Sequence, residues 1–123
     1  MQIAKLGVIG AGMMGAEIAL VFAMAGKSVM LNDTAQERLD EALKKLSAVL
    51  DTGISRKFWT EEEKLATLAN ISPTTNLQDF SDRQMVIEAV FEDAEVKGQV
   101  FKKLDKILDP NCIVASNTSS FSI

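Results

Sequence analysis

The sequence predicts an α/β fold with a doubly wound, mostly parallel sheet, and three observations lead to this prediction. Short apolar segments of strand length alternate with longer segments of helical periodicity. Three glycines separate the first apolar segment from the first helical one, where the backbone needs unusual freedom. The 123 residues match the size of one domain, and 47% hydrophobic residues suffice for a core. Such alternation is typical of parallel strands joined by helices.

Five strands and four helices are expected along the chain. The strands are expected at residues 3–9, 28–33, 71–77, 84–92 and 112–116, and the helices at residues 13–25, 35–50, 61–70 and 94–108. Gly26 should stop the first helix, and Gly53 is expected to break the second. Because two helices separate the second strand from the third, we expect a helical hairpin that stands out from the sheet. Thr60 and Glu63 have the spacing of a capping box for its second helix.

The three glycines have the G-x-G-x-x-G spacing of a dinucleotide-binding turn, in the strand-to-helix context that this motif requires. The first glycine makes the tight turn, the second lets a pyrophosphate approach the backbone, and the third lets the helix pack closely on the strand. The helix N-terminus directs its positive dipole end toward the phosphates. The cofactor-binding residues expected here are Gly10, Ala11, Gly12, Met13, Met14 and Gly15.

Asp33 ends the second expected strand, eighteen residues after Gly15. An acid at about 20 residues from the glycines accepts hydrogen bonds from the adenosine ribose in dinucleotide-binding folds. Its carboxylate would repel a 2′-phosphate, and the next residues, Thr34, Ala35 and Gln36, are not basic. The sequence therefore predicts NAD rather than NADP as the cofactor.

Composition and charge argue against several other classes of protein. Glu17 interrupts the apolar stretch around the glycines, which disfavours a signal peptide and a membrane span alike. A net charge of −4 with scattered basic residues argues against a nucleic-acid surface. The single cysteine, Cys112, cannot form an internal disulfide and is expected to be a small buried hydrophobe, compatible with a cytoplasmic location. No metal site is expected.

A polar stretch, "EAVFEDAEVK", follows the fourth expected strand, at the edge where ligands of open α/β sheets bind. It places Glu88, Glu92 and Asp93 near the strand end and Lys97 in the first turn of the next helix. A cation in that turn opposes the helix dipole. Lys97 therefore either serves a ligand or forms an i,i+4 pair with Asp93, and the sequence favours neither alternative.

Two further polar segments are candidates for a site. The stretch "ASNTSSFSI" follows the fifth expected strand and holds more hydroxyl and amide side chains than one helix cap requires, although a cap is the alternative. Arg56 and Lys57 lie at the turn of the helical hairpin. A solvated turn is the simpler interpretation of these two basic residues.

Together, "GVIGAGMMGAEIA", "LND", "VIEAVFEDAEVKGQVFKKLDKIL" and "ASNTSSFSI" resemble the NAD-binding domain of the 3-hydroxyacyl-CoA dehydrogenase family, over essentially the whole chain. The resemblance implies a Rossmann-type fold and an NAD-dependent enzyme of fatty acid or butanoate metabolism, including β-oxidation. Such an enzyme oxidises a (3S)-3-hydroxyacyl-CoA to a 3-oxoacyl-CoA. The resemblance also assigns roles, with Asp33 at the adenosine ribose, Glu92, Lys97 and Asn117 at the cofactor, Ser119 beside nicotinamide and substrate as an assisting catalytic residue, and Arg56 at CoA.

One departure from the family concerns the catalytic base. In the family the base is a histidine beyond the "SNTSS" motif, and these 123 residues contain no histidine. We therefore expect residues 1–123 to be an NAD-binding domain without the catalytic histidine and the C-terminal helical domain, inactive alone. The full-length protein is expected to be a cytoplasmic homo-oligomer. Two alternatives stay open, a gulonate-type β-hydroxy-acid dehydrogenase and a non-catalytic NAD-binding module.

Overall fold

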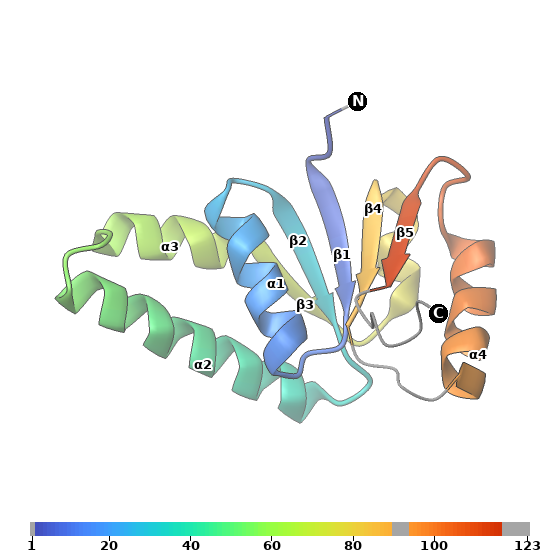
Figure 1. Cartoon of the computed structure of the whole chain (residues 1–123), viewed down its shortest axis with the longest axis horizontal. Coiled ribbons are helices and arrows are strands. Elements are labelled where there is room, and N and C mark those ends of the chain that lie inside the picture. Colours follow the sequence, from blue (N-terminus) through green and yellow to red (C-terminus); the bar gives the residue numbers. More distant parts are fainter. Residues whose placement is uncertain (1, 90–93, 117–123) are drawn as a thin grey trace.

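The computed structural model describes residues 2–89 and 94–116, and a five-stranded parallel sheet lies at its centre (Figure 1). The strands are β1 (Lys5–Ile9), β2 (Ser28–Asn32), β3 (Ile71–Thr74), β4 (Met85–Glu88) and β5 (Ile113–Ser116), in the order β3-β2-β1-β4-β5. The helices are α1 (Met13–Met24), α2 (Gln36–Ser55), α3 (Glu61–Ala69), the 3₁₀ helix η1 (Leu77–Asp82) and α4 (Ala94–Ile107). The chain winds outward from β1 to β3 and then returns to β4 on the other side, which confirms the doubly wound prediction.

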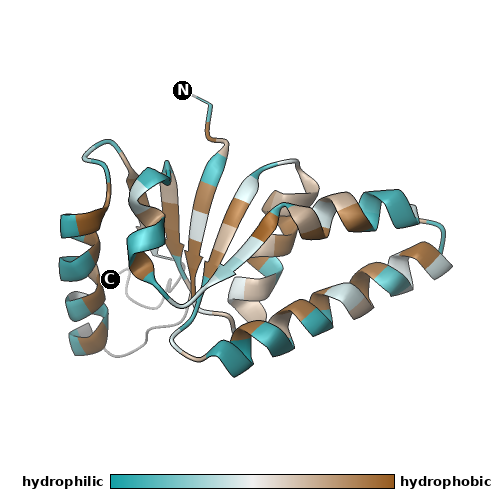
Figure 2. Ribbon diagram, turned by 180° about the vertical axis from the view of Figure 1, so that it is seen from behind, coloured by the Kyte–Doolittle hydropathy of each residue, from teal (hydrophilic) through white to brown (hydrophobic). Residues whose placement is uncertain are grey.

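Helices cover both faces of the sheet. On one face, Val8 packs in a core cluster with residues of α1 and α2. The next residue, Ile9, packs on the opposite face with Phe80 of η1 and Leu104 of α4. This alternation follows from the two-residue period of a strand. Figure 2 shows hydrophobic residues along the strands and α4 turning its hydrophobic side toward the sheet.

Helix α1 approaches the sheet through small side chains. Gly15, Ala16, Ala19 and Ala23 are buried, whereas the larger apolar residues Met14, Val21 and Met24 are exposed. The apolar periodicity of the sequence correctly predicted a helix here. The glycine motif predicted close packing at Gly15, but nothing in the sequence indicated that Ala16, Ala19 and Ala23 would also lie on the buried side.

The predicted helical hairpin is present, but the predicted break at Gly53 is wrong. Helix α2 continues through Gly53 to Ser55, and a Cβ atom at Gly53 would collide with the indole ring of Trp59. The glycine thus makes room for Trp59, whose Nε1 donates to the carbonyl oxygen of Leu50 at 2.8 Å. The predicted capping box of Thr60 and Glu63 is confirmed at the start of α3.

Two other features differ from the expected elements. The strand expected over residues 71–77 ends at Thr74, because Asn76 caps the 3₁₀ helix η1, which the sequence analysis did not predict. Cys112 is half-buried at the edge of the η1–α4 core cluster rather than fully enclosed. Burial still raises the pKa of its thiol.

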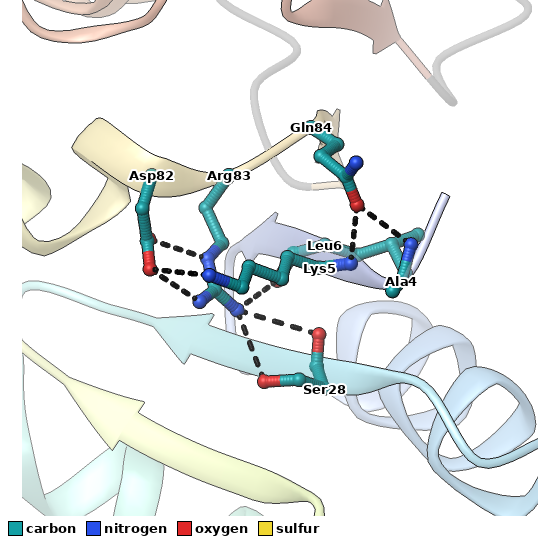
Figure 3. A network of polar contacts seen from close by, with 7 residues as sticks. All are labelled: Ala4, Lys5, Leu6, Ser28, Asp82, Arg83 and Gln84. Atoms are coloured by element: carbon teal, nitrogen blue, oxygen red, sulfur yellow. Dashed lines mark hydrogen bonds and ion pairs between the residues drawn. The ribbon is translucent and has the colours of Figure 1, made fainter. Parts of the chain in front are cut away.

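The amino-terminal edge of the sheet is held by a buried arginine (Figure 3). Arg83 is 4% exposed and donates to both carboxylate oxygens of Asp82, at 2.9 and 3.0 Å. Its Nη1 donates at 3.3 Å to the carbonyl oxygens of Leu6 and Ser28 and to the Ser28 hydroxyl. The Arg83 guanidinium therefore joins the starts of β1 and β2 to the end of η1. Its hydrogen bonds hold the pKa of Asp82 below its usual value. Among the described residues, every helix is too short or too polar to cross a membrane.

Candidate functional site

The glycine turn lies at the carboxyl edge of the sheet, between β1 and α1. Gly10 has a φ of 106°, a conformation that side chains with a Cβ rarely adopt. Its backbone N–H donates to the carbonyl oxygen of Asn32 at 2.7 Å, which ties the turn to the end of β2. The turn is therefore anchored to the neighbouring strand before any ligand is present.

The other two glycines of the motif have different surroundings. A Cβ atom at Gly15 would collide with the carbonyl oxygen of Gly10, so this position requires glycine for the packing of α1 on the turn. Among the described residues, no atom would lie within 4 Å of a Cβ atom at Gly12. Gly12 thus borders open space, which matches the role predicted for the second glycine of the motif.

The N-terminus of α1 can receive an anion. Gly12 is its N-cap residue and has no side chain to accept from the first-turn amides, and that turn consists of Met13, Met14, Gly15 and Ala16. The positive end of the helix dipole is therefore not offset by an acidic side chain of its own first turn. Open space at Gly12 together with this helix end fits a pyrophosphate group.

Asp33 directly follows β2 and lies beside the same turn. Its side chain is 5% exposed, and its two carboxylate oxygens accept from the backbone N–H groups of Ala11 and Ala35, each at 3.0 Å. Arg38, the next basic residue along α2, approaches the carboxylate at 3.4 Å but is itself 64% exposed. The carboxylate is therefore oriented mainly by backbone groups, and one of them belongs to the glycine turn.

Two hollows adjoin this arrangement. One, of about 130 Å³, lies between the glycine turn and the start of α2 and is lined in part by Gly12, Arg38 and Lys45. A larger hollow, of about 430 Å³, extends from the ends of β1 and β2 toward α4. Its lining includes Thr34 and the side chains of Lys103 and Lys106. Space is thus available beside the glycine turn and beyond the ends of β1 and β2.

A second polar cluster lies where β4 and β5 end. The Glu88 side chain is 0% exposed, and its carboxylate accepts from the Ser116 hydroxyl at 2.9 Å. Lys97 of α4 lies 3.1 Å from the same carboxylate and donates to the Ser116 Oγ at 2.6 Å. The sequence places Glu88 near this edge without indicating a role, and no pattern in it distinguishes Ser116 from its polar neighbours. The usable signal was a charged residue within the apolar strand segment "MVIE".

The predicted site residues are brought together only in part. The glycine turn and Asp33 adjoin one another, and Lys97 lies at the same edge of the sheet. Arg56 lies at the C-terminus of α2, at the tip of the hairpin and away from the glycine turn (Figure 1). Glu92, Asn117 and Ser119 lie outside the described residues. Within residues 2–89 and 94–116, no three His, Cys, Asp or Glu side chains are grouped to hold a metal ion.

Comparison with a family model identifies a broad match. Residues 5–123 match the model described as "3-hydroxyacyl-CoA dehydrogenase, NAD binding domain". A 3-hydroxybutyryl-CoA dehydrogenase of Bradyrhizobium diazoefficiens is 45% identical over 121 residues, which are 98% of this chain and 41% of that protein. A fatty acid oxidation complex subunit alpha of a Psychrobacter species is 39% identical, over 99% of this chain and 17% of its own length.

Solved structures agree with these sequence matches. The crystal structure of 3-hydroxybutyryl-CoA dehydrogenase from Escherichia coli has a TM-score of 0.94 at 34% identity, covering 97% of this chain and 25% of that one. The (S)-3-hydroxybutyryl-CoA dehydrogenase of Ralstonia eutropha has a TM-score of 0.92 at 34% identity, over 96% and 42% of the two chains. The chain therefore spans less than half the length of the relatives that it matches.

Proposed function

The chain belongs to the 3-hydroxyacyl-CoA dehydrogenase family, whose NAD-binding domain matches residues 5–123, and on this premise we propose the activity that it serves. Residues 1–123 form the part of the enzyme that binds NAD while a (3S)-3-hydroxyacyl-CoA is oxidised to a 3-oxoacyl-CoA. Relatives named as 3-hydroxybutyryl-CoA dehydrogenases and fatty acid oxidation subunits support this substrate class. They also support a place in fatty acid metabolism.

One observation carries the proposal most directly. The Asp33 carboxylate accepts from the backbone N–H of Ala11 at 3.0 Å, which places an oriented acid beside the glycine turn. A dinucleotide needs two such features together, a turn and helix end for its pyrophosphate and an acid for its ribose hydroxyls. Open space borders the turn, since no atom of the described residues would lie within 4 Å of a Cβ atom at Gly12.

The proposed placement of the cofactor follows from this geometry. The pyrophosphate lies against Gly12 and the N-terminus of α1, and the adenosine ribose hydroxyls donate to Asp33. The adenosine end then extends toward the larger hollow beside Thr34. Lys97 contacts the cofactor from α4, and the family resemblance adds Glu92, Asn117 and Ser119 to that set. Ser119 also faces the substrate, and Arg56 contacts CoA from the hairpin.

Residues 1–123 supply the proposed NAD site but not the general base that oxidation of the hydroxyl group needs. Bound NAD supplies the hydride acceptor. A positioned general base must take the hydroxyl proton, a contribution of about 10²–10⁴-fold. These 123 residues contain no histidine, and the buried carboxylates Asp33 and Glu88 already accept hydrogen bonds within the fold. We therefore expect the chain to bind NADH without oxidising a 3-hydroxyacyl-CoA. The full-length enzyme is proposed to be a cytoplasmic homo-oligomer.

Two measurements on the purified chain test the proposal. Fluorescence titration should show saturable NADH binding with weaker binding of NADPH, and an absorbance assay with 3-hydroxybutyryl-CoA and NAD should show no NADH formation. Gly12→Val is the matched variant, because a Cβ atom at Gly12 would meet no atom of the described residues within 4 Å and the side chain would enter the proposed pyrophosphate space. It should retain the circular dichroism of the parent and lose NADH binding. Absent NADH binding by the parent chain would contradict the proposed cofactor site, and turnover would contradict the assignment of the base.

A further inference from the structure

The most unusual group at the carboxyl edge is the Glu88 carboxylate. Glu88 ends β4 and pairs in register with Ile9 of β1 and Ser116 of β5, so it lies between two neighbouring strands. Its side chain is 0% exposed. An ionised carboxylate removed from water in this way is unfavourable unless charged or hydrogen-bonding partners surround it.

Lys97 and Ser116 are partners of this carboxylate, and they join three elements. The Lys97 ammonium reaches from the first turn of α4 to the end of β4, 3.1 Å from Glu88, and it donates to Ser116 Oγ at 2.6 Å. Ser116 in turn donates to Glu88 at 2.9 Å. The Lys97 side chain is only 15% exposed, so the ammonium is held rather than solvated.

Stability alone is a weak reason for this arrangement. A buried ion pair often contributes no more to folding than apolar residues of similar size, because both charges must be desolvated. Lys97 is also a cation in the first turn of a helix, where the dipole disfavours it. A buried ion pair and a lysine in the first turn of a helix are both unfavourable for folding. Their occurrence together is expected where a functional site needs the charge of the lysine.

We infer that Glu88 is a positioning residue of the cofactor site, which orients the Lys97 ammonium toward the bound dinucleotide. It also orients the hydroxyl of Ser116, the residue that directly precedes Asn117 in the sequence. The inference rests on the proposed NAD site, in which Lys97 contacts the cofactor. Glu88 is not placed to touch the cofactor itself, since its side chain is 0% exposed.

A double-mutant cycle on NADH affinity tests the inference. Glu88→Gln keeps the size of the side chain and removes the charge that holds Lys97, so the dissociation constant should rise about ten-fold. Lys97→Met should weaken binding by a similar factor in the parent chain but by little in the Glu88→Gln background. A coupling of this kind is expected when one residue acts through the other.

Controls separate this outcome from a purely structural role. Glu62→Gln makes the same charge change at an exposed position of α3 and should leave the affinity unchanged. If Glu88→Gln does not fold, Ser116→Ala takes its place in the cycle, because it removes the hydroxyl that both partners share. An unchanged affinity in folded Glu88→Gln, or an undiminished effect of Lys97→Met in that background, would overturn the inference. Failure of the proposed NAD site would instead appear as absent NADH binding by the unaltered chain.

Discussion

Each edge of the sheet buries one charged side chain that backbone groups hold, and the two side chains differ in sign. At the amino-terminal edge, the guanidinium of Arg83 donates to the carbonyl oxygens of Leu6 and Ser28. At the carboxyl edge, the Asp33 carboxylate accepts from the backbone N–H groups of Ala11 and Ala35. Arg83 and Asp33 thus each lie where the backbone presents the opposite partial charge.

This difference shows how one sheet separates structural from binding tasks. The helix N-termini of α1 and α4 lie at the carboxyl edge, where their dipoles favour anions, including a ligand's phosphates. At the amino-terminal edge, the N–H groups of Arg83 already donate to acceptors within the protein, so this guanidinium stabilises the fold rather than a ligand. We therefore expect substitutions at the amino-terminal edge to lower stability and those at the carboxyl edge to lower affinity for NADH.

The largest effect on stability is expected for a substitution at the carboxyl edge, where most substitutions should instead lower affinity for NADH. Gly15→Ala lies at the carboxyl edge, yet its Cβ would collide with the backbone of Gly10. We expect the free energy of unfolding to fall by about 3 kcal/mol, the upper range for overpacking. Urea unfolding followed by circular dichroism measures it. Gly12→Ala is the matched control, with a loss below about 1 kcal/mol at this cap position, and equal losses in the two variants would contradict the packing argument.

A second prediction concerns the amino-terminal edge itself. Arg83→Met retains an apolar stem and removes the donors to Asp82, Leu6 and Ser28, so the free energy of unfolding should fall by about 2–3 kcal/mol. The NADH affinity of the folded variant should match that of the parent chain in calorimetry. A clear loss of NADH affinity in fully folded Arg83→Met would show that the two edges are energetically coupled.

The third prediction is the reciprocal one at the carboxyl edge. Asp33→Ala removes the acceptor proposed for the ribose hydroxyls, a loss of about 1.5–3 kcal/mol that corresponds to a ten-fold or larger drop in NADH affinity. The difference in affinity between NADH and NADPH should become smaller, because the substitution also removes the repulsion between the Asp33 carboxylate and a 2′-phosphate. Calorimetry with both cofactors checks this, beside the exposed control Asp105→Ala. Unchanged NADH affinity in folded Asp33→Ala would contradict the assigned role of the acid.

The smallest effect is a pH dependence at the amino-terminal edge. Hydrogen bonds from Arg83 hold the pKa of Asp82 below its usual value, so the folded state favours the ionised carboxylate. This contribution to stability is present above the ordinary aspartate pKa of about 3.9 and disappears as the pH falls through the lowered pKa. The Asp82 side chain is 49% exposed, so solvent screening keeps the effect below about 1 kcal/mol.

Urea unfolding of the parent chain and of Asp82→Asn between pH 7 and pH 3 measures this contribution. The difference in unfolding free energy between the two proteins should shrink as the pH falls. A difference that stays constant over this range would mean that the carboxylate charge contributes nothing at this edge.

Features that depend on residues close together in the sequence could be predicted from it. The glycine spacing, the strand before it and the acid after the next strand predicted the turn and the position of Asp33, because each depends on residues within about one βαβ unit. The capping box of Thr60 and Glu63 was predictable for the same reason. The Gly53 break was a wrong prediction, because the indole that makes the glycine necessary belongs to the packing of the hairpin.

The sequence by itself determined the order of the five strands and four α-helices, the glycine turn and the acid after the second strand, since short-range patterns specify these features. Only the tertiary structure decided that Lys97 pairs with Glu88 and that Arg83 joins the starts of β1 and β2. Glu88 and Ser116 are 28 residues apart, and Arg83 and Leu6 are 77 apart. Such pairs form because parallel strands that are distant in the chain begin at one edge of the sheet and end at the other. The order of the strands in the sheet, rather than the spacing in the sequence, therefore sets which residues meet.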